Sequence, residues 1–291
     1  MAGNPLARQV IGLCLVGVVL ACSAERVAEK PASSVERFRY RPEKIEPGTV
    51  YHYTKSNLDG SNPARISIYV ATRTHLEVLK VEQGSEVLAF VTADIDWESF
   101  SADHLSSWHI LPDGLLRSQG ATGLNREDDS FTKFIMGAEF PARVEYYPFH
   151  VYNFDFTSFN FVFRHLVDPE QSFEIGVVDP DWKRILSPEF KPVGVQRGIF
   201  VFRGRARIDY VGDEPCNGTA CRKYRISGPG MANQEGFIWV DRDGGHFVRF
   251  EHPLPDNPAW NSFKLELEGI EHFTEPGWQK FITVERERNL H

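Results

Sequence analysis

The aromatic stretch at the centre of the chain, Tyr152 to Leu166 (YNFDFTSFNFVFRHL), limits the possible folds more than any other part of the sequence. With the strand period of two, its aromatic residues change face near Thr157, so a single strand would need a bulge there. With the helical period, four apolar residues from Phe159 to Leu166 share one face. Because phenylalanine is a mediocre helix former, such a helix depends on tertiary burial. We predict a strand through Phe156 and then a short helix, residues 158–166, packed into the concave face of a sheet.

Most other segments have the alternation that is typical of β-strands. Apolar and charged residues alternate from Phe200 to Tyr210, and again from Phe263 to Glu268. A hairpin turn is indicated at Asp243-Gly244-Gly245, and Trp278 to Val284 is a candidate edge strand. The sequence therefore predicts a mainly β fold, an antiparallel curved sheet or open half-barrel wrapped round one short Phe-rich helix.

The N-terminus has the pattern of an export signal. The apolar run from Val10 to Ala21 is shorter than the ~20 residues that span a bilayer, and it has the length of a signal-peptide core. The run ends VLACS, which resembles a bacterial lipobox and implies cleavage before Cys22 and attachment of lipid, including palmitate, to that residue. Ser23 after the cysteine favours transfer to the outer membrane. The alternative is an ordinary secretory signal followed by a chance cysteine.

Three segments follow from this reading. Residues 1–21 form a lipoprotein signal peptide, residues 22–48 hold the lipidated cysteine and a charged, proline-containing flexible tether, and residues 49–291 form a single β-rich periplasmic domain. Since an exported protein meets an oxidising compartment, we expect Cys216 and Cys221 to form a disulfide across a turn rather than a metal site.

Charge excludes one class of protein, and the motifs argue against several others without excluding an enzyme. Thirty-two basic and forty acidic residues give a net charge of −8, which is unfavourable for a general nucleic-acid binder. The signatures HExxH and GxSxG, the P-loop and the Rossmann fingerprint are missing from the sequence. We therefore predict no nucleic-acid partner, no cofactor, no metal site and no catalytic residue.

The surplus of phenylalanine, 22 residues in all, is the compositional feature that fits binding. A sheet wrapped round a Phe-lined helix can enclose either a packed core or a cavity for acyl chains. The candidate ligand-lining residues are Phe154, Phe156, Phe159 and Phe163.

Three arginines on one predicted strand, Arg203, Arg205 and Arg207, are candidates for contacts with a lipid head group, because guanidinium groups bind phosphate in a bidentate manner. The alternative is cross-strand pairing with acids such as Glu266 and Glu268.

An acidic cluster offers a different kind of site. On a strand, Asp94, Asp96 and Glu98 would share one face and could bind calcium or supply the paired carboxylates of a glycan hydrolase. Acidic residues at the end of a strand are more common than either site, and calcium sites usually add carbonyl ligands and a tight glycine turn.

The second half of the chain also resembles a known group of proteins. It contains a Phe-rich D-x-x-S-F segment that ends R-H-L at Leu166, a strand with charged residues on one face, a Cys-turn-Cys, the strand pair GFIWVDRDGGHFVRFE and an amphipathic last strand. This order resembles uncharacterised proteobacterial periplasmic proteins of unknown-function families, whose fold is similar to the open half-barrel of the LolA/LolB lipoprotein carriers. The resemblance implies the fold, transfers no catalytic residue, and agrees with an anchor at Cys22, since LolB is an outer-membrane lipoprotein.

Together these features predict an outer-membrane lipoprotein that faces the periplasm. Its expected role is non-enzymatic, as a binding or carrier module for a lipid, an acylated peptide or another apolar envelope component. A scaffold that binds another envelope protein is the first alternative, and a carboxylate-dependent glycan hydrolase is the second.

Overall fold

The computed structural model describes residues 31–135, 137–191, 193–196 and 198–290. The signal peptide, the lipobox and Cys22 lie outside these residues. The strands are β1 (Ala32–Ser33), β2 (Thr49–Ser56), β3 (Ala64–Val70), β4 (His75–Glu82), β5 (Leu88–Asp96), β6 (Ser101–Ile110), β7 (Leu116–Asn125), β8 (Ser130–Ile135), β9 (Ala138–Arg143), β10 (Tyr146–Tyr147), β11 (Phe149–Val151), β12 (Phe173–Pro180), β13 (Phe200–Cys216), β14 (Thr219–Ser227), β15 (Gly236–Asp241), β16 (Phe247–His252) and β17 (Phe263–His272).

The helices are short, apart from the last. They are α1 (Thr157–Val162), α2 (Trp182–Ile185) and α3 (Glu275–Asn289), with 3-10 turns η1 (Val35–Arg37), η2 (Pro42–Lys44), η3 (Tyr152–Phe154), η4 (Phe163–His165) and η5 (Pro229–Met231).

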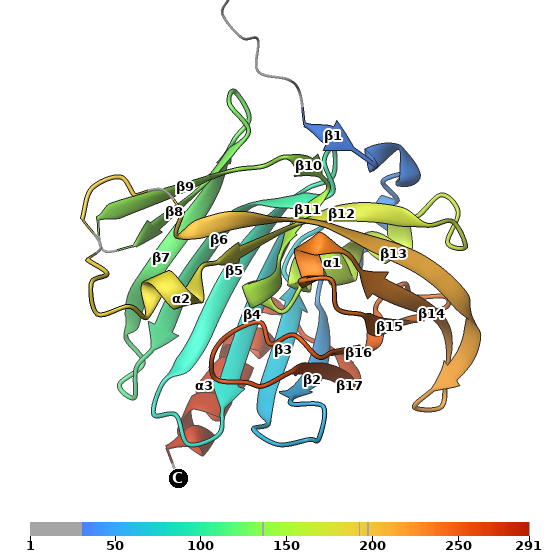
Figure 1. Cartoon of the computed structure of the whole chain (residues 1–291). Helices are drawn as coiled ribbons and strands as arrows, with labels where there is room; N and C mark the ends of the chain where they lie inside the picture. The colour runs from blue at the N-terminus through green and yellow to red at the C-terminus, as the bar shows by residue number, and fades with distance from the viewer. Residues whose placement is uncertain (1–30, 136, 192, 197, 291) are drawn as a thin grey trace, which may run out of the picture. The chain divides into compact units, whose positions relative to one another are not determined.

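One sheet of fifteen strands forms most of residues 49–272. Its order is β11-β12-β13-β14-β15-β16-β17-β2-β3-β4-β5-β6-β7-β8-β9, so the C-terminal strands join the N-terminal strands where β17 pairs with β2. Neighbouring strands are antiparallel, except β11 and β12. The sheet curves around α1 and leaves β11 and β9 as its two ends (Figure 1). This confirms the predicted mainly β fold, an open curved sheet around a Phe-rich helix.

The central aromatic stretch is helical earlier than predicted. The extended chain ends with β11, and Asp155 and Phe156 both have left-handed backbones, with φ of 52° and 49°. The predicted strand through Phe156 is therefore wrong, since two successive left-handed residues cannot continue a strand. Helix α1 begins at Thr157, and each of its residues is buried, which provides the tertiary support that its phenylalanines require.

The C-terminal segment is a helix, and the predicted edge strand from Trp278 to Val284 is wrong. Thr274 caps α3 by accepting a hydrogen bond from the backbone N–H of Gly277. Trp278 and Ile282 are four residues apart, so they share one face of the helix and pack against Tyr69 and its neighbours. Since Ile68 and Val70 belong to the main core, α3 covers the opposite face of the sheet.

Much of the predicted tether belongs to the folded domain. Phe38 and Ile45 are buried in the main core, and the Phe38 ring lies 5.1 Å from the ring of Phe100. The prediction of a flexible segment is therefore wrong for residues 31–48, because isolated apolar residues anchor it without a regular period. The compact unit extends from Pro31 to His291.

Candidate functional site

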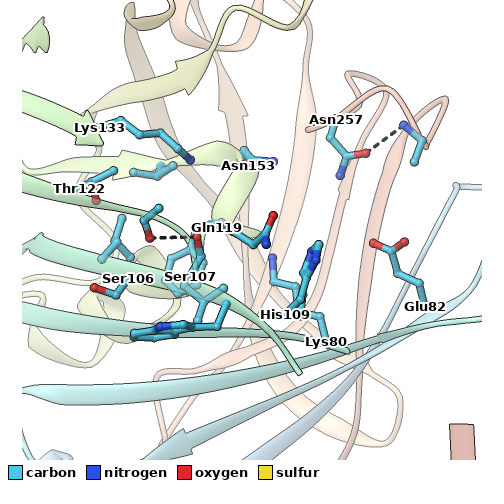
Figure 2. Close-up of a pocket in the computed structure, with 18 of the residues that line it drawn as sticks. Lys80, Glu82, Ser106, Ser107, His109, Gln119, Thr122, Lys133, Asn153 and Asn257 are labelled. Atoms are coloured by element: carbon cyan, nitrogen blue, oxygen red, sulfur yellow. Dashed lines mark hydrogen bonds between the residues drawn. The ribbon is translucent and has the colours of Figure 1, made fainter. Parts of the chain in front are cut away.

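A pocket of about 510 Å³ is lined by strands β2–β8, the end of β11, η3, α2, the start of β13 and the loop 257–260. Its size falls within the usual range for small-molecule sites, roughly 300–1,000 Å³. Five aromatic side chains from distant parts of the chain line it, Trp108, Phe154, Trp182, Phe200 and Trp260. Figure 2 shows polar residues among them, including Lys80, Lys133 and Asn153. The lining thus combines a large aromatic surface with polar and charged side chains from several strands.

A buried network of charges supports one wall of the pocket. The Lys55 ammonium lies 2.8 Å from a carboxylate oxygen of Asp155 and 2.5 Å from one of Asp256, and Lys80 also pairs with Asp155. The left-handed backbone at Asp155, just before α1, directs its carboxylate to both lysines.

The pKa values of the groups in this network depend on burial and on the charges of their partners. Burial opposes ionisation of Asp155, but Lys55 and Lys80 outweigh it and hold the pKa of Asp155 far below its ordinary range. Burial likewise disfavours the charged form of Lys55, and Asp155 and Asp256 outweigh it and raise its pKa. Asp256 shares Lys55 with a second acid, so burial dominates and raises its pKa to about 7. Lys55 and Lys80 are thus committed to acids of the protein itself.

Lys133 differs from the other two pocket lysines. It lies on β8 opposite Thr122 of β7, and both residues line the pocket. Its ammonium lies 5.6 Å from the centre of the Phe200 ring. Burial lowers the pKa of Lys133, and Asp179 opposes this shift only through longer-range attraction.

Asp179 is a buried acid behind the pocket. Its carboxylate lies 3.2 Å from the Arg203 guanidinium and accepts a hydrogen bond from the backbone N–H of Asn153. Burial nevertheless raises the pKa of Asp179 to about 8, because it outweighs the attraction of Arg203. At neutral pH the acid is therefore mainly protonated, and it compensates little of the charge of Lys133.

This pKa predicts a pH dependence of stability. The pKa is raised from an ordinary 3.8, so the neutral acid favours the fold at low pH and its contribution is lost as pH rises from about 4 to about 8. We expect the free energy of unfolding of the unchanged chain to fall, relative to Asp179→Asn, by up to about 1.4 kcal/mol per pH unit in this interval. Urea titrations at pH 5 and pH 8 measure it.

Asp209→Asn is the matched control. Burial raises the pKa of Asp209, but hydrogen bonds from Ser172, Arg207 and Arg225 outweigh it, and the net shift is downward. This carboxylate stays ionised over the interval, so its variant should keep the slope of the unchanged chain. If Asp179→Asn also kept that slope, Asp179 would be ionised against Arg203 in the folded protein.

One of the four predicted ligand-lining phenylalanines lines the pocket. Phe154 does so, whereas Phe156, Phe159 and Phe163 are packed inside the core. The ring of Phe159, for example, lies 4.8 Å from that of Phe163 and 5.7 Å from that of Phe247. These three residues do not line the pocket because α1 fills the centre of the curved sheet, which leaves the pocket beside it.

The three candidate head-group arginines are paired with acids. Arg205 lies 2.8 Å from Glu174, and Arg207 lies 2.8 Å from Asp209. Arg203 falls where the register of β12 and β13 shifts, and this bulge accompanies its contact with Asp179. None of the three lines the pocket described above, so the head-group prediction is not supported. The alternative of ion pairing is correct, but the partners are not Glu266 or Glu268.

The acidic cluster on β5 has local structural contacts. Asp94 lies 2.6 Å from the His75 ring, and Asp96 accepts hydrogen bonds from the backbone N–H groups of Glu98 and Ser99 and pairs with Arg126. These carboxylates lie away from the pocket, as its lining contains none of them. Among the described residues, no group of three or more histidine, cysteine or acidic side chains is arranged to hold a metal ion.

The predicted disulfide is not formed in the structure. Cys216 lies opposite Thr219, and Cys221 lies opposite Glu214, so the cysteines are diagonal neighbours across the hairpin. The two thiols are close enough for a hydrogen bond, but no bond joins their sulfur atoms. Both are free and buried beside Trp239. Burial, with a further contribution from Cys216, raises the pKa of the Cys221 thiol to about 12.

Comparisons with known proteins find remote similarity. No protein-family model and no curated protein matches the chain. A domain named for outer membrane lipoprotein sorting from Vibrio parahaemolyticus is 10% identical, with 84% of this chain and 94% of that chain covered and a TM-score of 0.30. A DUF1329 family protein from Desulfovibrio piger is 9% identical, with 80% and 89% covered and a TM-score of 0.29.

A third solved structure, named as a lipoprotein, comes from Parabacteroides distasonis. It is 12% identical, with 78% of this chain and 96% of that chain covered and a TM-score of 0.27. Similarity at this level identifies neither a family nor a function for the chain. Within the described ranges, no helix has the length and apolar character needed to span a bilayer.

Proposed function

We propose that the protein is a non-enzymatic binding module that holds a lipid or another apolar envelope ligand in the pocket beside α1. The observation that carries this proposal is the aromatic lining, in which Trp108, Trp182 and Trp260 meet Phe154 and Phe200 around about 510 Å³. A concave site in which aromatic side chains meet polar groups is a usual form of a small-molecule site, and here the polar side chains include Lys80, His109 and Lys133. The acids and lysines of the adjacent network are neutralised by one another, so they keep the wall rigid without requiring a reaction.

The proposal includes the location of the protein. The lipobox-like sequence supports lipid attachment at Cys22 and an outer-membrane protein that faces the periplasm. The anchor would keep the pocket close to a source of lipid.

A substitution that fills the pocket tests the proposed function. Ala121 contributes a small side chain to the lining, so Ala121→Trp should occupy the space of a ligand. We expect lipid extraction and native mass spectrometry to recover about one ligand per unchanged chain and less than about a tenth of that from the variant. The experiment is done on chains that also carry Cys22→Ser, so that acyl groups of the anchor are not counted.

Ala220→Trp is the control, because Ala220 is exposed on β14 and does not line the pocket. It should retain the ligand. Equal amounts of lipid in both variants would exclude this pocket as the binding site. An unchanged chain that is recovered without any ligand, and that takes up none when lipid is added, would contradict the proposed function itself. The mass of the protein that retains Cys22, purified from the membrane fraction, shows whether lipid is attached to this residue.

A further inference from the structure

One of the lysines that line the pocket has no ion-pair partner among the described residues. Lys133 extends into the pocket from β8 (Figure 2), and in the part of the chain that the structure describes its ammonium makes no ion pair or hydrogen bond. This separates it from Lys55 and Lys80, which pair with Asp155. A half-buried ammonium that has lost part of its hydration is costly unless an anion or an acceptor replaces the water.

The residue directly opposite Lys133 has an unused hydroxyl. Thr122 is 4% exposed, and its Oγ1 is buried without a hydrogen-bond partner. Since directly opposed residues of an antiparallel pair project from the same face, about 4.5–5.5 Å apart at Cβ, the hydroxyl and the ammonium face the same space. Buried hydroxyls are nearly always hydrogen-bonded, so a donor and a cation side by side in a pocket indicate a missing acceptor.

The surroundings favour an anion that is attached to an apolar group. The Lys133 ammonium lies near the Phe200 ring, Leu105 lies opposite Thr122 on β6, and the lining of the pocket also includes Val151 and Phe154. A small hydrated ion would leave this apolar surface exposed to water, whereas an amphiphile would cover it with its chain. The neutral state of Asp179 at pH 7 leaves the positive charge available to the ligand.

We infer that Lys133 and Thr122 bind the anionic head group of a single-chain amphiphile, with the ammonium as the counter-ion and the threonine hydroxyl as a hydrogen-bond donor. This inference rests on the proposed function, because it assigns a role to two polar residues of the same pocket. The shared chemistry of the head group is a compact anion with exposed oxygens, either a carboxylate or a phosphate monoester. The aromatic part of the pocket holds the chain.

Binding of three probes with the same chain length tests the inference. The pocket tryptophans report binding through their fluorescence when purified protein is titrated with hexadecanoate, hexadecyl phosphate or hexadecanol. We expect the unchanged chain to bind at least one anion about 10- to 100-fold more tightly than the alcohol, as a charge-assisted hydrogen bond contributes. Lys133→Gln should remove that preference and leave hexadecanol binding within about twofold. Thr122→Val should weaken the preferred anion about 3- to 10-fold.

Lys280→Gln is the matched control, because it removes the same charge from the exposed surface of α3. It should bind all three probes as the unchanged chain does. The ratio of hexadecanoate to hexadecyl phosphate binding identifies the head group. Lys133→Gln should fold at least as stably as the unchanged chain, since it removes a desolvated cation, and its melting temperature verifies this.

The outcomes separate this inference from the proposed function. If hexadecanol and both anions bind equally well, and Lys133→Gln changes none of them, the head-group site is wrong while the apolar pocket stands. If none of the three probes binds to the unchanged chain, the pocket is not a lipid site and both proposals fall.

Discussion

Replacing Lys55 with methionine should destabilise the protein by about 3–5 kcal/mol, because removal of one partner leaves buried charge uncompensated. Lys55 is 3% exposed and lies between the carboxylates of Asp155 and Asp256, both of which are buried. Methionine has a similar length, so the loss reports charge rather than packing. Urea denaturation at pH 7 measures it.

Two further variants make this result specific to the network. Lys264→Met removes a lysine that pairs with Glu266 near the surface, and its cost should stay below about 1 kcal/mol. Adding Asp256→Asn to Lys55→Met should restore part of the lost stability, since it removes one of the stranded acids. A double variant less stable than Lys55→Met would mean that Asp256 is neutral in the folded chain and contributes through its hydrogen bonds.

Replacing Phe159 with alanine should cost about 3–5 kcal/mol, the usual range for a large aromatic residue in a packed core. The side chain is 0% exposed, and its ring lies 4.8 Å from Phe163, 5.4 Å from Phe156 and 5.0 Å from His150. Thermal and urea unfolding measure the loss. Phe134→Ala is the control, because Phe134 is 44% exposed and its truncation should cost less than about 1 kcal/mol.

Ligand binding distinguishes a core role of Phe159 from a binding role. Under conditions where the variant remains folded, Phe159→Ala should bind hexadecanoate as the unchanged chain does, because Phe159 does not line the pocket. Loss of binding with little loss of stability would support the original prediction that this residue contacts the ligand.

The sequence predicts the class of fold well because strand alternation and a Phe-rich helix follow from local residue order. The sequence does not predict the segments whose structure depends on tertiary contacts. Phe38 has no apolar period around it, yet it packs against Phe100. Trp278 and Ile282 could have indicated α3 through their spacing of four residues and the threonine cap at Thr274.

The pocket lysines were missed, although the sequence contains a signal for them. Each follows a core residue by two positions on the same strand, so each continues an apolar face: Lys55 after Tyr53, Lys80 after Val78 and Lys133 after Phe131. A lysine on the core side of a strand is unusual and needs a counter-charge or a cavity. Lys55 and Lys80 have a counter-charge, because the fold brings Asp155 and Asp256 to them from more than seventy residues away along the chain. The sequence around each lysine does not show this.

The pairing of β2 with β17 also determines when the sheet can be completed. Thr49 lies opposite His272, so the two halves of the sheet meet only after nearly the whole chain has been made. Each half consists mainly of hairpins between consecutive strands, which close small loops and form quickly. Joining the halves requires closure of a loop of roughly two hundred residues, which makes this late step slow. Until then, β2 is an unprotected edge at which an unfinished chain can associate with another copy of itself.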